Sequence, residues 1–386
     1  MNDSTVGSLP RRVFRRSGYS VFPLGLGCMR FPALADGSNR TDHDRAVQLI
    51  RYAIDKGIDY LDTAWPYCGG DSEAIVGQAL QDGYADRVRI ATKLPTWLVN
   101  DASDVDRYLN EQLDRLNTDT IDFYLVHALK ASWWRRLLEN GVMDNLEQQR
   151  RAGRIRHLGF SFHDGAAAFA PILEGWNWDF ALLQYNIMDE HYQAGEAGLR
   201  LATERGVDVI IMEPLRGGRL TSTIPAEIQH IWNELPPGCS PAKTMLRWVL
   251  DRPGVVMALS GMSDEAQIDE NVAAVKSLAD GGLTNQERDV IARVRDAYRT
   301  RITTRCTDCG YCLPCPAGVH IPRVLSLYDD ARAYEALETS RQSYREFVPE
   351  EARGDRCTTC GACEKTCPQK VEIQRHLRDG HELLKP

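Results

Sequence analysis

Short apolar runs and longer amphipathic stretches alternate over about residues 20–280 of this 386-residue chain. The apolar runs are rich in Val, Ile and Leu without alternating polar residues, which is typical of parallel strands buried on both faces. These predicted strands are Val21–Cys28, Ile58–Thr63, Val88–Leu94, Phe123–Ala128, His157–Ser161, Ala181–Tyr185, Val207–Met212 and Val255–Ser260. The predicted helices between them are Thr41–Lys56, Ser72–Gln81, Asp104–Leu116, Ser132–Arg151, Ala166–Glu174, Glu196–Arg205, Pro241–Asp251 and Asp264–Ala279. Eight such units predict an α/β fold, the (β/α)8 or TIM barrel.

Eight of the eleven cysteines lie in the last fifth of the chain, in two runs that each end in Cys-Pro. The runs are Cys306, Cys309, Cys312 and Cys315, and then Cys357, Cys360, Cys363 and Cys367. The second run has the spacing of bacterial ferredoxins, in which three cysteines bind one [4Fe–4S] cluster and the fourth binds the other. Two runs therefore predict two [4Fe–4S] clusters. Only two residues separate Cys312 from Cys315, where three are usual, so it stays open whether Cys315 reaches the second cluster.

Other uses of these cysteines fit the spacing less well. A zinc ribbon uses two pairs of ligands, whereas each run here is a threefold repeat with a trailing Cys-Pro. Disulfides need an oxidising compartment, and the N-terminus shows no apolar segment of a secretory signal. Arg11-Arg12 resembles a twin-arginine signal, but no removable apolar segment follows it. We therefore expect a cytoplasmic protein.

Charge and hydropathy exclude two classes of partner. The net charge of −8 argues against nucleic acid, for which a basic surface is expected. No apolar stretch approaches the roughly 18 residues that span a bilayer, so no membrane partner is expected. The partners that remain are a small-molecule substrate and a redox partner protein.

The cysteine runs also indicate how the chain divides. Residues 284–301 have the pattern of a helix that leads out of the barrel, and the segment between the two runs, Pro322–Phe347, is helical in character. We therefore expect a barrel domain at 1–300 and a small, mostly helical iron–sulfur domain at 301–386. The clusters would replace part of a core that so short a segment cannot supply.

Four polar residues follow consecutive predicted strands of the barrel. Asp62 ends the second strand and Tyr67 lies five residues later, while Lys93 ends the third strand and His127 the fourth. Barrel enzymes carry their catalytic residues at the C-terminal ends of the strands. The four side chains are therefore expected to lie together and to be catalytic.

Their chemistry is complementary. A tyrosine hydroxyl with an ordinary pKa of about 10 is a poor proton source unless a cation stabilises its phenolate. Lys93 would lower the pKa of Tyr67 in this way, and Asp62 would keep Lys93 charged. Tyr67 could then exchange a proton with a carbonyl oxygen that His127 orients. Trp65, Trp97, Trp133 and Trp134 follow the same strands and would either line a substrate pocket or pack at the barrel rim.

With these residues in place, the chain resembles the aldo-keto reductase superfamily. Arg12–Val21 followed by Leu24-Gly25-Leu26-Gly27 is similar to the family's N-terminal hairpin and first strand, and its catalytic Asp, Tyr, Lys and His fall on the four residues above. Cys315–Pro322 is similar to a subgroup that carries a C-terminal ferredoxin-type domain. The resemblance implies a barrel that uses NAD(P)H to interconvert a carbonyl and an alcohol. The cofactor-contacting residues that it implies are Ser161, Gln184, Met212, Glu213, Leu215, Gly261, Gln267, Glu270 and Asn271.

Several of these positions depart from the family pattern. Phe162 stands where an Asn usually follows Ser161, and Met212 stands where an aromatic ring often stacks on the nicotinamide. Gly261 and Gln267 replace the cationic pair that reads a 2′-phosphate, so NADH is favoured over NADPH. Arg216 and Arg219 would either contact the pyrophosphate or be solvated loop charges.

The iron–sulfur runs leave alternative functions open. Hydride transfer moves two electrons together, whereas each cluster passes one at a time. No sequence feature demands a flavin to bridge this gap. The leading interpretation is a carbonyl/alcohol oxidoreductase; the alternatives are an electron-transfer reductase without nicotinamide and an iron–sulfur sensor on an inert barrel.

Overall fold

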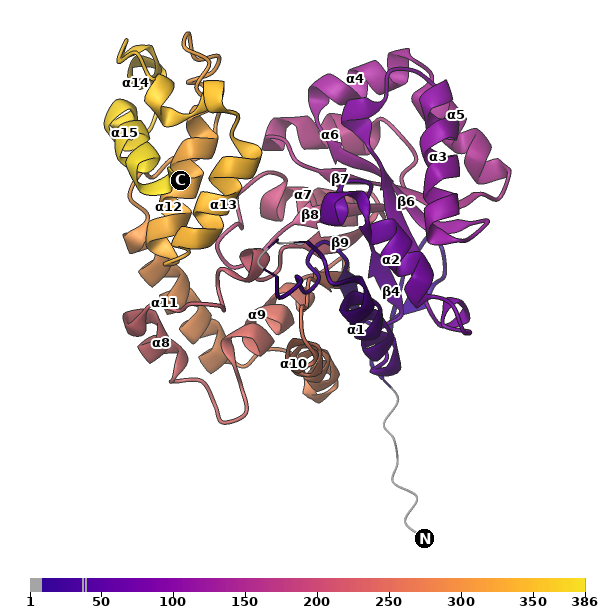
Figure 1. The fold of residues 1–386 in the computed structure, drawn as a ribbon. Coiled ribbons are helices and arrows are strands. Elements are labelled where there is room, and N and C mark those ends of the chain that lie inside the picture. Colours follow the sequence, from indigo (N-terminus) through magenta and orange to yellow (C-terminus); the bar gives the residue numbers. More distant parts are fainter. Residues whose placement is uncertain (1–8, 37, 39, 386) are drawn as a thin grey trace. The chain divides into compact units, whose positions relative to one another are not determined.

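The computed structural model describes residues 9–36, 38 and 40–385, and within them eight parallel strands form a closed barrel (Figure 1). The strand order around the barrel is β10-β3-β4-β5-β6-β7-β8-β9. The barrel strands are β3 (Leu24–Gly27), β4 (Tyr60–Asp62), β5 (Arg89–Leu94), β6 (Ile121–Leu129), β7 (Ile155–Phe162), β8 (Phe180–Gln184), β9 (Asp208–Met212) and β10 (Val255–Ser260). Each overlaps a predicted apolar run, so the predicted (β/α)8 barrel is confirmed.

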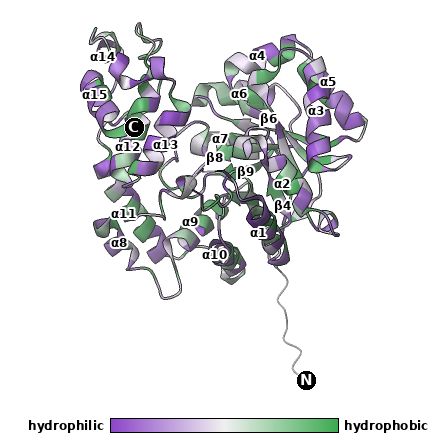
Figure 2. Cartoon of the chain, in the orientation of Figure 1, coloured by the Kyte–Doolittle hydropathy of each residue, from purple (hydrophilic) through white to green (hydrophobic). Residues whose placement is uncertain are grey.

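Helices alternate with these strands along the chain. They are α1 (His43–Asp55), α2 (Ser72–Ala79), α3 (Ser103–Leu116), α4 (Ala131–Glu139), α5 (Val142–Arg151), α6 (Ala166–Glu174), α7 (Gly195–Glu204), α9 (Pro241–Leu250) and α10 (Glu265–Lys276). Figure 2 shows that α3 and α5 are largely hydrophilic on their outer sides. The prediction of one helix over Ser132–Arg151 is wrong, because the chain breaks at Asn140–Gly141 into α4 and α5. Gly141 has a φ of 67°, which interrupts helical geometry there.

An N-terminal hairpin contributes to the barrel core. Its strands β1 (Arg12–Val13) and β2 (Ser20–Val21) pair antiparallel, and Phe14 between them packs on Phe123 and Phe180 of the barrel, with ring centroids 5.1 and 6.4 Å away. Close packing continues at Gly25 on β3. An added Cβ there would lie 2.6 Å from the Leu259 side chain, so only glycine fits without a shift.

The chain separates into two compact units. Among the described residues, the first contains residues 9–217 (without 37 and 39) and 242–283, and the second contains residues 218–241 and 284–385. This division differs from the predicted boundary at residues 300 and 301. Helix α11 (Asn285–Arg301) packs on α8 (Ala226–Trp232) and α12 (Ile321–Ala333), so it belongs with the cysteine-bearing segment (Figure 1).

The second unit is helical, as the sequence predicts. Its remaining helices are α13 (Leu337–Phe347), α14 (Ala362–Thr366) and α15 (Ile373–Leu384). Its core contains apolar residues of α12 such as Val324, Leu325 and Leu327, with Tyr344 of α13 and Leu377 of α15. No helix in the described ranges is long and apolar enough to cross a membrane.

Candidate active site and cluster sites

The structure brings Asp62, Tyr67 and Lys93 into one hydrogen-bonded group. Asp62 is the last residue of β4, Lys93 lies near the end of β5, and Tyr67 begins the short 3-10 helix Tyr67–Gly70. The Lys93 Nζ donates to Asp62 Oδ1 at 2.6 Å, to the Thr63 carbonyl oxygen at 2.7 Å and to Tyr67 Oη at 3.3 Å. The ammonium therefore lies between a carboxylate and a phenol, as the catalytic interpretation requires.

Burial governs the protonation of this group. Lys93 is 1% exposed. Burial alone would lower its pKa, but attraction to Asp62 and Tyr67 outweighs that effect and leaves the pKa of Lys93 above its ordinary value. Burial likewise raises the pKa of Asp62, and the charge and hydrogen bond of Lys93 oppose this rise. The 2.6 Å contact favours the ion pair at neutral pH.

The expected lowering of the Tyr67 pKa is wrong for this structure. Burial raises the pKa of Tyr67 by more than Lys93 lowers it, and the charges of Asp62 and Glu213 add to the rise. Lys93 does stabilise the Tyr67 phenolate, as the sequence analysis expected. The net pKa is nevertheless raised, because the cost of burying the phenolate is larger, and that cost cannot be judged from a sequence. Tyr67 therefore keeps its proton at neutral pH.

His127 completes the group from β6. Its ring lies 6.1 Å from the Tyr67 ring and 5.2 Å from the Trp97 ring, measured between centroids. It is 8% exposed, and its Nδ1 has no hydrogen-bond partner among the described residues. Burial, followed by the charges of Lys93 and His163, lowers the pKa of His127 well below its ordinary value. A neutral imidazole therefore faces Tyr67.

The aromatic residues expected near the substrate have different surroundings. Trp97 is 37% exposed and lies 6.5 Å from Trp133, whose ring is 5.0 Å from the Lys130 Nζ. Trp134 instead packs on Trp178, and Trp65 packs on Tyr108. Trp97 and Trp133 are therefore the candidates to line a substrate pocket.

Three residues expected to contact a nucleotide hydrogen-bond within the protein. The Ser161 hydroxyl accepts from the Ala128 backbone N–H at 2.7 Å. The Asn271 side chain is 3% exposed and donates to Ser260 Oγ at 3.1 Å, and Gln267 Nε2 donates to Asp264 Oδ2 at 2.7 Å. Each of these contacts stabilises the end of a strand or helix, which a sequence motif alone does not reveal.

The other expected positions lie at the strand ends or on α10. Gln184 ends β8 and Met212 ends β9. Glu213 follows with a φ of 52°, and its backbone carbonyl oxygen accepts from Asn186 Nδ2 at 3.1 Å. Leu215 is half-buried in the next turn. Gly261 follows β10 and Glu270 is exposed on α10.

The arginines on the loops differ in their contacts. Arg30, on the loop after β3, donates from Nη1 to the Gly217 carbonyl oxygen, and an added Cβ at Gly261 would lie 3.9 Å from the Arg30 Cβ. Arg216 donates to Asp189. Arg219 belongs to the second unit and lies 3.5 Å from Asp330, so it is an ion-paired structural residue there. Arg30 had no motif to mark it and was missed in the sequence.

The sequence analysis also missed two residues near the tetrad. Gln193 lies between β8 and α7, and its Nε2 lies 3.2 Å from His163 Nδ1. His163 follows β7, and its backbone N–H donates to the Leu129 carbonyl oxygen at the end of β6 at 3.3 Å. No spacing rule identifies these residues, because their proximity depends on two loops.

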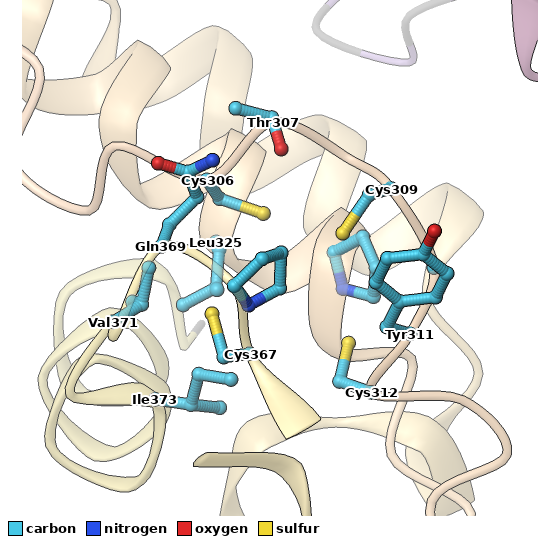
Figure 3. Close-up of a pocket in the computed structure, with 13 residues that line it drawn as sticks. Cys306, Thr307, Cys309, Tyr311, Cys312, Leu325, Cys367, Gln369, Val371 and Ile373 are labelled. Atoms are coloured by element: carbon cyan, nitrogen blue, oxygen red, sulfur yellow. The ribbon is translucent and has the colours of Figure 1, made fainter. Parts of the chain in front are cut away.

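The eight cysteines of the two runs line two pockets in interleaved sets. One pocket is lined by Cys306, Cys309 and Cys312 together with Cys367, and Figure 3 shows these side chains around a common space. The other is lined by Cys357, Cys360 and Cys363 together with Cys315. The fourth cysteine of each run therefore joins the first three of the other run, and Cys315 does so despite its short spacing.

The donor chemistry of these pockets suits clusters. Within the described part of the chain, no three His, Cys, Asp or Glu side chains are close enough to hold a single metal ion. A cubane needs a wider arrangement, because each thiolate binds a different iron. Burial raises the pKa of Cys306 and of Cys363 to about 11, so these thiols need a bound cation to ionise at neutral pH.

Comparison with known proteins gives the family of each part. Residues 23–281 match the aldo/keto reductase family, and residues 305–372 match a 4Fe-4S dicluster domain. The chain is similar to an NADH-specific methylglyoxal reductase of Escherichia coli, with 26% identity over 317 residues that cover 70% of this chain and 95% of that enzyme. It is also similar to a 6-dehydroglucose reductase of Novosphingobium aromaticivorans, with 29% identity over 289 residues, 69% of this chain and 90% of that enzyme.

Solved structures show the same barrel. An aldo-keto reductase from Bacillus halodurans in its holo form is 25% identical, has a TM-score of 0.63, and is matched over 74% of this chain and 96% of its own. An aldo-keto reductase from Klebsiella pneumoniae in complex with NADPH is 24% identical with a TM-score of 0.60 over 74% and 95% of the two chains, and supports the fold alone. The chain is an oxidoreductase that belongs to the aldo/keto reductase family and carries a C-terminal 4Fe-4S dicluster domain.

Proposed function

We propose that the protein interconverts a small carbonyl compound and its alcohol, with Tyr67 as the acid–base group and NAD(P)H as the reductant, and that it carries two [4Fe–4S] clusters. The observation that carries the proposal is the position of the Lys93 Nζ, 2.6 Å from Asp62 Oδ1 and 3.3 Å from Tyr67 Oη. One relative is named as a methylglyoxal reductase, which supports a small carbonyl substrate. The name of the same relative, an NADH-specific reductase, supports a nicotinamide cofactor.

The chemistry follows from the protonation of the tetrad. Since the pKa of Tyr67 lies above its ordinary value, the phenol holds a proton to donate to the carbonyl oxygen during reduction. Lys93 then stabilises the phenolate that remains. Neutral His127 donates a hydrogen bond that orients the same oxygen, and a bound reduced nicotinamide would supply hydride to the carbonyl carbon.

The residues present fit a dinucleotide. Gln184 and Met212 end neighbouring strands, so they lie at the rim where the tetrad also lies. Arg30 and Arg216 offer cationic groups for the pyrophosphate. The absence of a cationic side chain at Gly261 and the internal hydrogen bond of Gln267 support a preference for NADH. We further propose that a redox partner protein binds this chain and that the protein is cytoplasmic.

Two clusters are proposed from the interleaved cysteines. Cys306, Cys309, Cys312 and Cys367 would hold one cluster, and Cys315, Cys357, Cys360 and Cys363 would hold the other. Each cluster would pass single electrons.

A second candidate is an electron-transfer reductase that uses no nicotinamide. The observation that favours it is the side chain of Phe162, which is fully buried, next to Ser161, whose hydroxyl already accepts a backbone hydrogen bond. Phe162 has no amide to offer a carboxamide, and at Ser161 only the hydroxyl O–H is left to donate. Dinucleotide binding distinguishes the two candidates.

The test is anaerobic purification followed by iron and sulfide analysis and by titration with NADH and NADPH. We expect about eight iron and eight sulfide per chain, saturable NADH binding, and weaker NADPH binding. Cys315→Ala should lose about half of the iron, and Cys68→Ser, outside the runs, should lose none. Failure of the wild-type protein to bind either dinucleotide would favour the nicotinamide-free reductase.

A further inference from the structure

A chain of hydrogen bonds at the barrel rim begins at a fixed ion pair. Arg216 Nη1 donates to Asp189 Oδ1. Asp189 Oδ2 accepts from Gln184 Nε2 at 2.9 Å and from Asn186 Nδ2 at 2.8 Å. A carboxylate only accepts hydrogen bonds, so Gln184 must face it with its NH2 group. The amide oxygen of Gln184 is thereby turned away from Asp189.

The orientation of the Gln184 amide determines the hydrogen-bonding roles of the next two side chains, Gln193 and His163. Gln184 Oε1 lies 3.5 Å from Gln193 Nε2, so Gln193 must offer its NH2 group in turn. The same nitrogen lies 3.2 Å from His163 Nδ1, which therefore accepts and leaves the ring proton on Nε2. Burial, followed by the charge of Lys130, lowers the pKa of His163 to about 4, so the neutral ring persists at neutral pH.

The network ends in an unused acceptor. Gln193 Oε1 is buried, and among the residues that the structure describes it has no hydrogen-bond partner. Gln193 also has a φ of 52°, a left-handed conformation that costs free energy for a residue other than glycine. A buried carbonyl oxygen without a partner is unfavourable as well. The surrounding loops therefore hold Gln193 in an arrangement that a ligand with an N–H donor would stabilise.

The unused acceptor lies close to the tetrad. His163 directly follows β7, which pairs with β6, the strand that carries His127, and the His163 backbone N–H donates to the Leu129 carbonyl oxygen at 3.3 Å. His163 therefore lies at the same strand ends as the tetrad. Phe162, the preceding side chain, is fully buried against Phe169. Phe162 is therefore not available to a ligand, and His163 is the next side chain after β7 that can contact one beside the tetrad.

We propose that Gln193 and His163 together bind the carboxamide of the nicotinamide ring. Gln193 Oε1 accepts from the carboxamide NH2, and His163 Nε2–H donates to the carboxamide oxygen. A primary carboxamide offers this pair of one donor group and one acceptor side by side. The inference rests on the proposed use of a nicotinamide cofactor and names the residues that orient it.

The test compares NAD⁺ with its 3-acetylpyridine analogue, which keeps the carbonyl oxygen and replaces the NH2 group by methyl. Dissociation constants are measured by tryptophan fluorescence on the full, cluster-loaded chain. Wild-type protein should bind NAD⁺ about tenfold more tightly than the analogue, because the analogue leaves Gln193 Oε1 unpaired. Gln193→Leu should bind both alike. His163→Phe should weaken both by a similar factor and keep the preference.

Two controls separate binding from folding. ADP-ribose lacks the nicotinamide, so its affinity should be the same in wild type and Gln193→Leu. Gln229→Leu, on the surface of α8, should leave every affinity unchanged. The inference is overturned if Gln193→Leu keeps the preference for NAD⁺, if wild type shows no preference, or if the variant also loses ADP-ribose. A wild-type chain that binds no dinucleotide overturns the proposed function as well.

Discussion

The barrel unit and the cysteine-bearing unit hold their functional side chains in opposite ways. In the barrel, the Lys93 ammonium is buried and donates to Asp62, Thr63 and Tyr67, all of which belong to the protein. In the second unit, Cys309 and Cys360 are exposed, although each helps to line a pocket with other thiols. In the barrel, hydrogen bonds within the protein thus fix the Lys93 side chain. In the second unit, the thiols need a bound metal cluster as their partner.

The difference extends to the cores. Aromatic residues such as Phe14, Tyr60 and Phe123 fill the barrel interior and fix the strands that carry the tetrad. In the second unit, Cys367 is part of the apolar core itself. Other cluster cysteines pack against that core, namely Cys306, Cys312, Cys315, Cys357 and Cys363. A cluster bound by these thiols would complete a core that the side chains leave incomplete.

Removal of iron should therefore produce the largest effect. We expect anaerobic chelation to unfold the second unit and to leave the barrel folded, because metal binding and folding are coupled when the ligands line the core. Circular dichroism should lose the helical signal of that unit, while the barrel should keep dinucleotide binding. Unchanged helical content after complete iron loss would show that both units are organised by their own side chains.

Asp62→Asn should have the next largest effect and should act on the barrel alone. It removes the carboxylate that pairs with the buried Lys93 ammonium, and breaking a buried pair costs about 3–5 kcal/mol. We expect a fall in stability by chemical denaturation and a fall in kcat at unchanged iron content. Asp122→Asn alters another buried carboxylate, near the start of β6, and should lower stability without lowering kcat. Equal loss of kcat in both variants would contradict this assignment.

His163 should produce a smaller, pH-dependent effect. Its pKa is about 4 in the folded protein and about 6.5 when unfolded, so the unfolded chain binds more protons between these values. Stability should therefore decrease as pH falls from about 6.5 to 4, by roughly 2 kcal/mol for a partly exposed ring. His163→Gln should show a shallower fall in apparent Tm, whereas His43→Gln, at an exposed site, should match wild type. Parallel Tm curves for all three proteins would contradict a neutral His163 in the folded protein.

The barrel could be predicted from sequence because its signal is local. Runs such as Val207–Met212 are apolar throughout, and each became a strand within a few residues of the predicted bounds. Gly141 shows the limit, since a single residue with positive φ divided a predicted helix in two. The grouping of α8 with α11 could not be predicted from the sequence, because it depends on contacts between segments far apart in the chain.

The site was predictable where motif and geometry coincide. Strand ends identified Asp62, Lys93 and His127, because the C-terminal ends of parallel strands meet at one rim. The pKa of Tyr67 was misjudged, since desolvation depends on every neighbour and not on Lys93 alone. Gln193 could not be identified from the sequence, because its contacts with His163 and Gln184 form only when the chain is folded.

The central proposal is that Asp62, Tyr67, Lys93 and His127 form a catalytic group, and Tyr67→Phe tests this proposal most directly. The measurement is kcat for NADH-dependent reduction of methylglyoxal by cluster-loaded protein, with Tyr60→Phe, a buried tyrosine of the barrel core, as the matched control. We predict a fall of about 10²- to 10⁴-fold for Tyr67→Phe at unchanged iron content and NADH affinity, and little change for Tyr60→Phe. Wild-type kcat in Tyr67→Phe would contradict proton transfer by Tyr67.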